Sequence, residues 1–149
     1  GPQLIPHPDK PDAKVLHIRR PDENDPDGAV WNFPAAINGQ LILRLKALEG
    51  FAGGQVSLGD RMFDPCDNTG EELACHTLAL PIKPGGWHEL SLEWTAEYCV
   101  ATLDGELLQT FEARFAYPNG LSYLRLRSTA QSVDQGGFVV ESVKMEVKP

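Results

Sequence analysis

Lysine and arginine are scarce in this sequence, and their scarcity excludes one large class of partners. They total 13 against 21 aspartates and glutamates, so the 149-residue chain carries a formal net charge of −8. A phosphate backbone or an anionic membrane would meet repulsion over most of such a surface. We therefore expect no nucleic acid and no anionic lipid as partner. Neutral ligands, cationic ligands and anionic ligands met by a local arginine cluster stay open.

Long apolar runs and common catalytic motifs are missing too. No run approaches the roughly 18 residues that a membrane-spanning helix requires, and no signal peptide is visible. The sequence has no G-x-S-x-G elbow, no phosphate-cradling loop and no H-E-x-x-H motif. We expect no membrane span, and none of these motifs points to an enzyme.

Cysteine is rare, and its three positions favour no zinc site. Cys66, Cys75 and Cys99 form no CxxC pair, which a structural zinc site of the usual spacing would need. Cys66 and Cys75 bracket a turn-rich loop and could form a disulfide in an exported protein, but spacing alone leaves this open. Cys99 lies in an alternating segment and is expected to be a small buried hydrophobe.

Short segments in which apolar and polar residues alternate make up most of the chain. In residues 39–50, Leu41, Leu43, Leu45 and Ala47 fall on one face, and the other face holds Gln40, Ile42, Arg44, Lys46 and Leu48. We count roughly nine such segments and no convincing amphipathic helix. The pattern predicts one all-β domain, an antiparallel two-sheet β-sandwich of jelly-roll type.

Three local features predict positions within the sheets. Asp104-Gly105 lies between two alternating runs and supplies the positive backbone angles of a type I′ hairpin turn. Residues 29–37 contain Pro34, which suits an edge strand or a loop. The long final run, residues 136–147, is expected to lie centrally, beside the first strand.

The first 13 residues differ in composition from the rest. Residues 1–12 hold four prolines and little to bury, and the opening Gly1-Pro2 is typical of a scar left by tag removal. We predict a linker or extended arm over residues 1–13 and a single β-sandwich domain over residues 14–149.

Four stretches carry a resemblance to a known superfamily: WHELSLEW, VATLDGEL, YPNGLSYLRLRSTA and GGFVVESVKMEV. They resemble the concanavalin A-like jelly-roll domains, laminin-G-like in topology, that accompany bacterial carbohydrate-active enzymes. More narrowly, HIRRPDENDPDGAVWNFPAAINGQLILRL and RMFDPCDNTGEE look like the accessory β-sandwich of sialidase-like propeller proteins. The resemblance covers about residues 15 to 147.

The resemblance implies a non-catalytic carbohydrate-binding module within a larger glycan-degrading enzyme. Its expected partners are a polysaccharide or glycan and a neighbouring catalytic domain. The parent protein would be secreted, periplasmic or on the cell surface. A purely structural role, bracing a catalytic propeller without binding sugar, competes closely, and no residue decides between the two.

A jelly-roll glycoside hydrolase or lyase is the third possibility. Such enzymes place two or three carboxylates on one strand face, and Glu89 and Glu93 share a face. We favour a solvated surface for both, because burial would demand partners that neighbouring residues do not obviously supply.

Sugars are bound by flat aromatic faces and by amides, carboxylates or arginine forks. Two groups of residues offer these. One is a pair of loops at the edge of the sandwich, and the other is the alternating face of residues 121–127. The candidates are Trp31, Asn32, Phe33, Asp64 and Asn68 at the edge, and Tyr123, Arg125 and Arg127 on the face.

We favour the edge, because proline lowers the cost of ordering such loops. Trp31 would stack on the sugar, Asp25 and Asp27 would fix hydroxyls or a calcium ion, and Asp64 and Asn68 would contribute from the facing loop. The alternatives are that Trp31 and Phe33 cap the core, that the acidic loops are simply solvated, and that Arg125 and Arg127 lie on a solvated face paired with glutamate.

Overall fold

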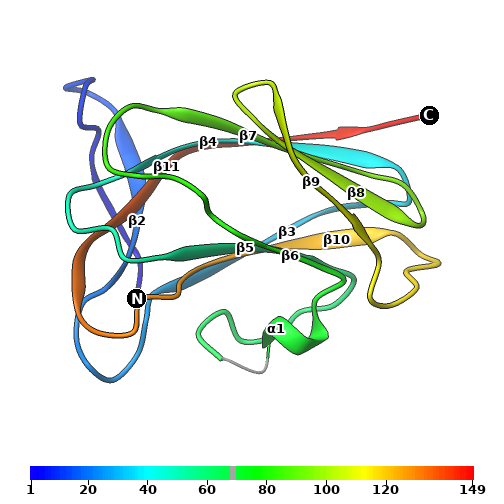
Figure 1. The fold of residues 1–149 in the computed structure, drawn as a ribbon, viewed down its shortest axis with the longest axis horizontal. Helices are drawn as coiled ribbons and strands as arrows, with labels where there is room; N and C mark the ends of the chain where they lie inside the picture. The colour runs from blue at the N-terminus through cyan, green and yellow to red at the C-terminus, as the bar shows by residue number, and fades with distance from the viewer. Residues whose placement is uncertain (68–69) are drawn as a thin grey trace.

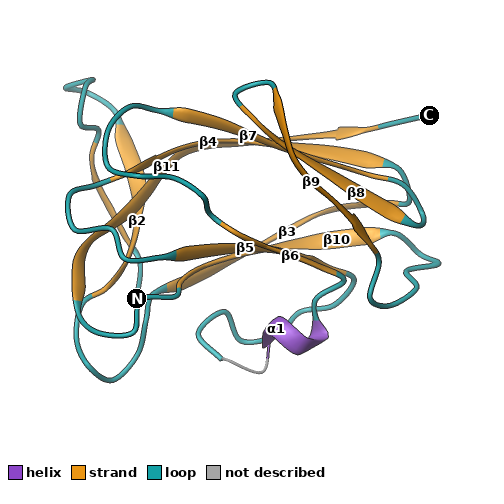
Figure 2. Ribbon diagram, viewed as in Figure 1, coloured by secondary structure: helices purple, strands orange, loops and turns teal. Residues whose placement is uncertain are grey.

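A computed structural model describes residues 1–67 and 70–149. The chain forms two antiparallel sheets packed face to face (Figures 1 and 2). The seven-stranded sheet has the order β1-β2-β11-β4-β7-β8-β9, and the four-stranded sheet has the order β3-β10-β5-β6. The predicted β-sandwich is confirmed.

The elements follow the alternating segments closely. The seven-stranded sheet comprises β1 (Gln3–Pro6), β2 (Lys14–Arg20), β4 (Gly39–Ala47), β7 (His88–Trp94), β8 (Tyr98–Leu103), β9 (Glu106–Glu112) and β11 (Asp134–Val147). The four-stranded sheet comprises β3 (Gly28–Ala36), β5 (Gly54–Gly59), β6 (His76–Ala79) and β10 (Leu121–Ser128). The helix α1 (Gly70–Leu73) lies beyond the four-stranded sheet, on the side away from the other sheet (Figure 2).

Alternation places one face of each strand in the core. Leu41, Leu43 and Leu45 of β4 are completely buried, while Arg44 between them is exposed. Trp94 of β7 and Phe138 of β11 fill the largest share of the same core. Full burial of one such side chain stabilises the fold by about 1.5–3 kcal/mol, so the period of two accounts for the layer architecture.

The local predictions hold. Asp104 and Gly105 both have positive φ, 52° and 84°, as a type I′ turn requires. β11 lies between β2 and β4 in the seven-stranded sheet. β3, which contains Pro34, lies at the edge of the four-stranded sheet. Proline can occupy an edge strand because its missing N–H faces no neighbour.

The N-terminal segment is tied to the sandwich more tightly than a linker would be. Residues 3–6 pair with β2, and His7 is buried, with its ring 5.0 Å from that of Trp87. Its Nδ1 accepts the backbone N–H groups of Asp9 and Lys10, so Nε2 carries the proton donated to Glu141. Residues Gln3–Pro6 form the outermost strand of the seven-stranded sheet.

All three cysteines are free thiols, so the disulfide that the sequence left open between Cys66 and Cys75 is not formed. Cys99 is fully buried, as predicted, and burial raises the pKa of its thiol to about 12. Such a thiol stays protonated at neutral pH and packs as a small apolar side chain.

None of the helices in the described part of the chain has the length and apolar character needed to cross a membrane.

Candidate functional site

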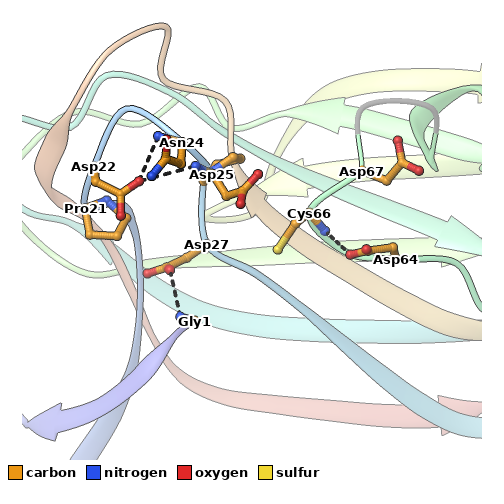
Figure 3. Close-up of a pocket in the computed structure, with 10 residues that line it drawn as sticks. Gly1, Pro21, Asp22, Asn24, Asp25, Asp27, Asp64, Cys66 and Asp67 are labelled. Carbon is orange, nitrogen blue, oxygen red and sulfur yellow. Dashed lines mark hydrogen bonds and ion pairs between the residues drawn. The ribbon is translucent and has the colours of Figure 1, made fainter.

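The two acidic loops named from the sequence meet at one end of the sandwich. They form a cavity of about 710 Å³ (Figure 3), which is lined by Pro21, Asp22, Asn24, Asp25, Pro26 and Asp27 of the first loop, by Asp64, Cys66 and Asp67 of the second, and by Gly1. Four of its carboxylates, those of Asp22, Asp25, Asp64 and Asp67, come from exposed positions on the loops. We call this cavity the acidic pocket.

The loop of residues 21–27 is held by its own polar groups. The Asp22 carboxylate accepts the backbone N–H of Asn24 at 2.8 Å, and Arg20 donates to the carbonyl oxygens of Glu23 at 3.0 Å and Ala130 at 2.7 Å. Asp25 follows in this turn with its side chain exposed. Because these bonds exist without a ligand, little ordering cost would remain to be met on binding.

Asp27 differs from Asp25, because it lies at the base of the pocket and is only 3% exposed. Its Oδ2 accepts the backbone N–H of Arg19 at 3.3 Å, and its Oδ1 lies 3.7 Å from the amino group of Gly1. Figure 3 shows Asp27 turned toward Gly1. Asp27 therefore supports the loop from below and Asp25 faces solvent.

The facing loop is anchored by the two arginines of β10. Arg125 donates to the carbonyl oxygen of Asp67, and Arg127 donates to the same oxygen at 3.2 Å. Arg125 also lies over the ring of Phe63, 5.4 Å from its centroid. The loop covers the outer face of the four-stranded sheet, and the two guanidinium groups hold it there.

The expectation of a solvated face for Arg125 and Arg127 is wrong. The two residues are 2% and 6% exposed, because Asp67 and the start of α1 at Gly70 lie over them. Burial, and next the charge of Arg127, lower the pKa of Arg125. Their donors reach a backbone carbonyl in this arrangement, and a ligand clamp at this place stays a prediction.

The two aromatic residues predicted for the edge site, Trp31 and Phe33, lie on β3 and not in the acidic pocket. Trp31 is 40% exposed and borders an apolar cleft of about 400 Å³ between the sheets, together with Leu16 and Val143. Phe33 is buried against Trp94, with ring centroids 5.8 Å apart, as expected of a core-capping residue. The structure therefore does not bring Trp31 to the acidic pocket beside Asp25.

Two further predicted residues lie away from the acidic pocket. Asn32 is exposed on β3, and its register partner on β10 is the half-buried Tyr123. Asn68 lies outside the described residues. Asp22 and Asp67, which the sequence placed only in a general acidic segment, prove to line the pocket, and the density of acids in both loops is the signal for them.

Glu89 and Glu93 lie on the solvated outer face of β7, as favoured from the sequence. Both are exposed, the register partner of Glu89 is Arg44, and Glu93 lies 3.8 Å from the Lys148 ammonium.

Residues 1–67 and 70–149 contain no group of three or more His, Cys, Asp or Glu side chains arranged to hold an ion. Asp25 and Asp27 alone, with Asp27 already bonded to the backbone, would leave a calcium ion short of the six to eight oxygens that it takes.

The two-sheet β-sandwich is similar in fold to solved structures of galectins and to part of a sialidase. A sialidase structure matches with a TM-score of 0.66 and 11% identity, over 97% of this chain and 17% of the sialidase. The chicken liver agglutinin CG-16 matches with a TM-score of 0.57 and 16% identity, over 80% of this chain and 100% of that one. A toad ovary galectin in complex with thio-digalactose matches with a TM-score of 0.52 and 14% identity, over 80% of this chain and 98% of that one.

The chain thus spans about a sixth of the sialidase and nearly the whole of each lectin. No protein-family model matches the sequence, and no curated protein sequence matches it. At these identities the structural likeness establishes the fold alone.

Proposed function

We propose that the chain is a non-catalytic carbohydrate-binding module that holds a glycan in the acidic pocket and serves an attached glycan-degrading enzyme. The observation that carries this is the convergence of two loops, far apart in sequence, whose carboxylates face one solvent-filled cavity of about 710 Å³. Carboxylate oxygens accept hydrogen bonds from sugar hydroxyls, and such charge-assisted bonds are the stronger kind.

The charge of the pocket selects among sugars. Asp22, Asp25, Asp64 and Asp67 repel uronic and sialic acids, so the ligand is a neutral or amino sugar. None of the described residues that line this cavity is aromatic, so none of them adds stacking to the affinity. Binding is accordingly weak, with a Kd on the order of 1 mM for a short oligosaccharide.

Two likenesses support the proposal. The toad ovary galectin shares the fold, and its structure was solved in complex with thio-digalactose. The sialidase holds a domain of this fold within a far longer chain, which supports attachment to an enzyme.

Calorimetric titration of glycans against Asp25→Asn and Asp64→Asn variants tests the site. Each substitution keeps the side-chain size and removes a charged acceptor, so each weakens binding about tenfold. The Glu89→Gln variant is the matched control, because it removes one charge from an exposed strand face elsewhere, and it binds like the unchanged protein. Equal affinity in all three variants contradicts the proposed site.

A structural role is the second candidate, and the apolar cleft beside Trp31 favours it. All residues that line this cleft are apolar, and Leu4 nearby on β1 is 67% exposed. A neighbouring catalytic domain could cover this surface. If glycan titrations stay silent while deletion of the domain destabilises the full-length enzyme, the structural role replaces the carbohydrate-binding one.

A further inference from the structure

One edge of the sandwich is open in a way that the other three are not. β1 has four residues and ends in Pro6, β3 contains Pro34, and β6 has four residues and is followed by Pro81. Short strands and prolines at an edge prevent another strand from pairing there. These three edges are closed to added strands.

β9 has none of these protections. Its seven residues, Glu106–Glu112, contain neither proline nor glycine, and one side pairs with β8, with a single register shift at Leu108. Within the part of the chain that the structure describes, no strand pairs with its other side. Every second N–H and C=O of such a strand points away from its neighbour and is free to bond an added strand.

The side chains of β9 and its surroundings suit a protein contact. Leu107 is 67% exposed, Leu108 is 37% exposed, and Tyr98 on β8 is 46% exposed. Leucine, threonine and phenylalanine dominate the middle of β9, and such residues pair well across strands. The strand therefore offers both free backbone groups and apolar contact area.

Charge identifies what kind of segment fits. Residues 84–113, which include β7, β8 and β9, hold six carboxylates and no lysine or arginine. Glu106 and Glu112 stand at the two ends of β9, and Glu97 lies in the turn beside Tyr98. Among the described residues, none of these three carboxylates forms an ion pair.

A second copy of this chain does not fit. Antiparallel pairing of β9 with itself about Gln109 would place Glu106 opposite Glu112 at both ends. Like charges directly opposite one another destabilise a strand pair. The acidic ends exclude self-association and favour a basic partner.

A shallow cavity at one end of β9 matches a basic side chain. Glu97, Tyr98 and Glu112 line a cavity of about 400 Å³ together with three alanines. A lysine or arginine there would lie between two carboxylates and against an aromatic ring, both of which attract cations. Arg114, the first basic residue after β9, is turned away and donates to the carbonyl oxygen of Glu71.

From these observations we propose that β9 is a docking edge for an extended segment of a partner protein, which adds as an eighth strand. The segment is apolar or β-branched in its middle and carries a lysine or arginine near each end. Backbone hydrogen bonds pair the partner segment with β9, and the two glutamates of β9 favour a partner segment with positive charge.

The test uses a synthetic peptide of alternating valine and threonine with a lysine at each end, titrated by fluorescence anisotropy. It binds the intact protein, and binding weakens as salt is raised, because the charges involved are exposed. A peptide with glutamate at each end binds at least about tenfold more weakly, as expected for the loss of two exposed ion pairs. A lysine-ended peptide that is N-methylated at alternate residues does not bind, because it cannot donate to the β9 carbonyls.

Paired variants locate the contact. The double variant Glu106→Gln with Glu112→Gln weakens binding of the lysine-ended peptide about tenfold. The double variant Glu89→Gln with Glu93→Gln removes the same charge from an internal strand of the same sheet and changes binding little. All four positions are exposed, so both proteins fold.

Three results overturn the proposal: no binding at about 1 mM peptide, equal binding of the N-methylated peptide, or equal weakening in both double variants. A concentration-dependent dimer in sedimentation that disappears in the β9 variant would assign the edge to a second copy and equally overturn it.

Discussion

Among single residues, His76 is the one whose burial has the clearest consequence for stability. It is 3% exposed, its Nε2 lies 3.1 Å from the Tyr117 hydroxyl, and that hydroxyl donates to the carbonyl oxygen of Thr95 at 2.5 Å. Nε2 must therefore carry the proton, and Nδ1 has no partner in the described structure. Burial lowers the pKa of His76 from 6.5 to about 4.

A folded-state pKa below the unfolded value means that the unfolded chain binds the proton first as the pH falls. Protonation of His76 therefore lowers the free energy of unfolding as the pH falls from about 6.5 to about 4. The loss amounts to about 3 kcal/mol. Urea unfolding across this range measures it. The His76→Leu variant loses this part of the pH dependence, whereas His88→Gln, at a partly exposed position, retains it. An unchanged pH dependence in His76→Leu contradicts the assignment.

Glu141 has the opposite surroundings, because it lies at the surface among three donors. His7, Lys10 and Arg44 approach its carboxylate at 3.0, 3.3 and 3.2 Å. The hydrogen bond from His7, followed by those from Lys10 and Arg44, lowers the pKa of Glu141 from 4.5 to about 2. Its stabilising contribution is present above about pH 4.5 and is lost as the pH falls through about 2.

A carboxyl NMR titration of Glu141 therefore has its midpoint near pH 2. The His7→Leu variant moves the midpoint toward 4.5, because the largest cause of the shift is removed. A midpoint near 4.5 in the unchanged protein would contradict the network. Lys10 and Arg44 are exposed, so their share of the effect on the free energy of unfolding is small.

At the scale of elements, the β8–β9 hairpin depends on backbone conformation at one glycine. Gly105 has φ +84°, and a Cβ added there would have no atom within 4 Å; a Cβ at Gly86, before β7, would be equally free, but Gly86 has no left-handed φ. Replacing each with alanine therefore separates backbone strain from packing. Gly105→Ala lowers the free energy of unfolding by about 1 kcal/mol, and Gly86→Ala leaves it unchanged or raises it by a few tenths. Equal effects in thermal unfolding would contradict the turn assignment.

Elements that depend on local pattern could be predicted from the sequence, and contacts between distant segments could not. The inward leucines of β4, the Asp104-Gly105 turn and the central place of β11 all follow from alternation and turn chemistry. The burial of Arg125 and Arg127 escaped prediction, because their alternation with leucine is equally typical of a solvated face. The two arginines are buried because a distant segment, which includes Asp67, folds over them.

The site shows the same division. The acid content of residues 21–27 and 64–67 pointed to both loops, and the fold brings them to one pocket. The separation of Trp31 from that pocket depends on which way β3 faces. Trp31 and Asp25 are six residues apart, but β3 begins between them at Gly28 and turns the Trp31 side chain toward the cleft between the sheets.

At the scale of the whole molecule, the sandwich has two separate surfaces to which we assign a binding role. One end carries the acidic pocket, with loops braced by Arg20, Arg125 and Arg127. The β9 edge carries free backbone groups and unpaired carboxylates. A ligand at the pocket and a partner at β9 would meet different faces of the same domain, so each can be tested without disturbing the other.

The central claim is that the acidic pocket binds a neutral or amino sugar, and NMR shift mapping during glycan titration tests it most directly. The account predicts that a neutral or amino-sugar oligosaccharide shifts the amide signals of residues 21–27 and 64–67, and that a uronic-acid oligosaccharide of the same length does not. Shifts confined to Trp31 and Tyr123, or no shift with any glycan at about 10 mM, ten times the expected Kd, would contradict it.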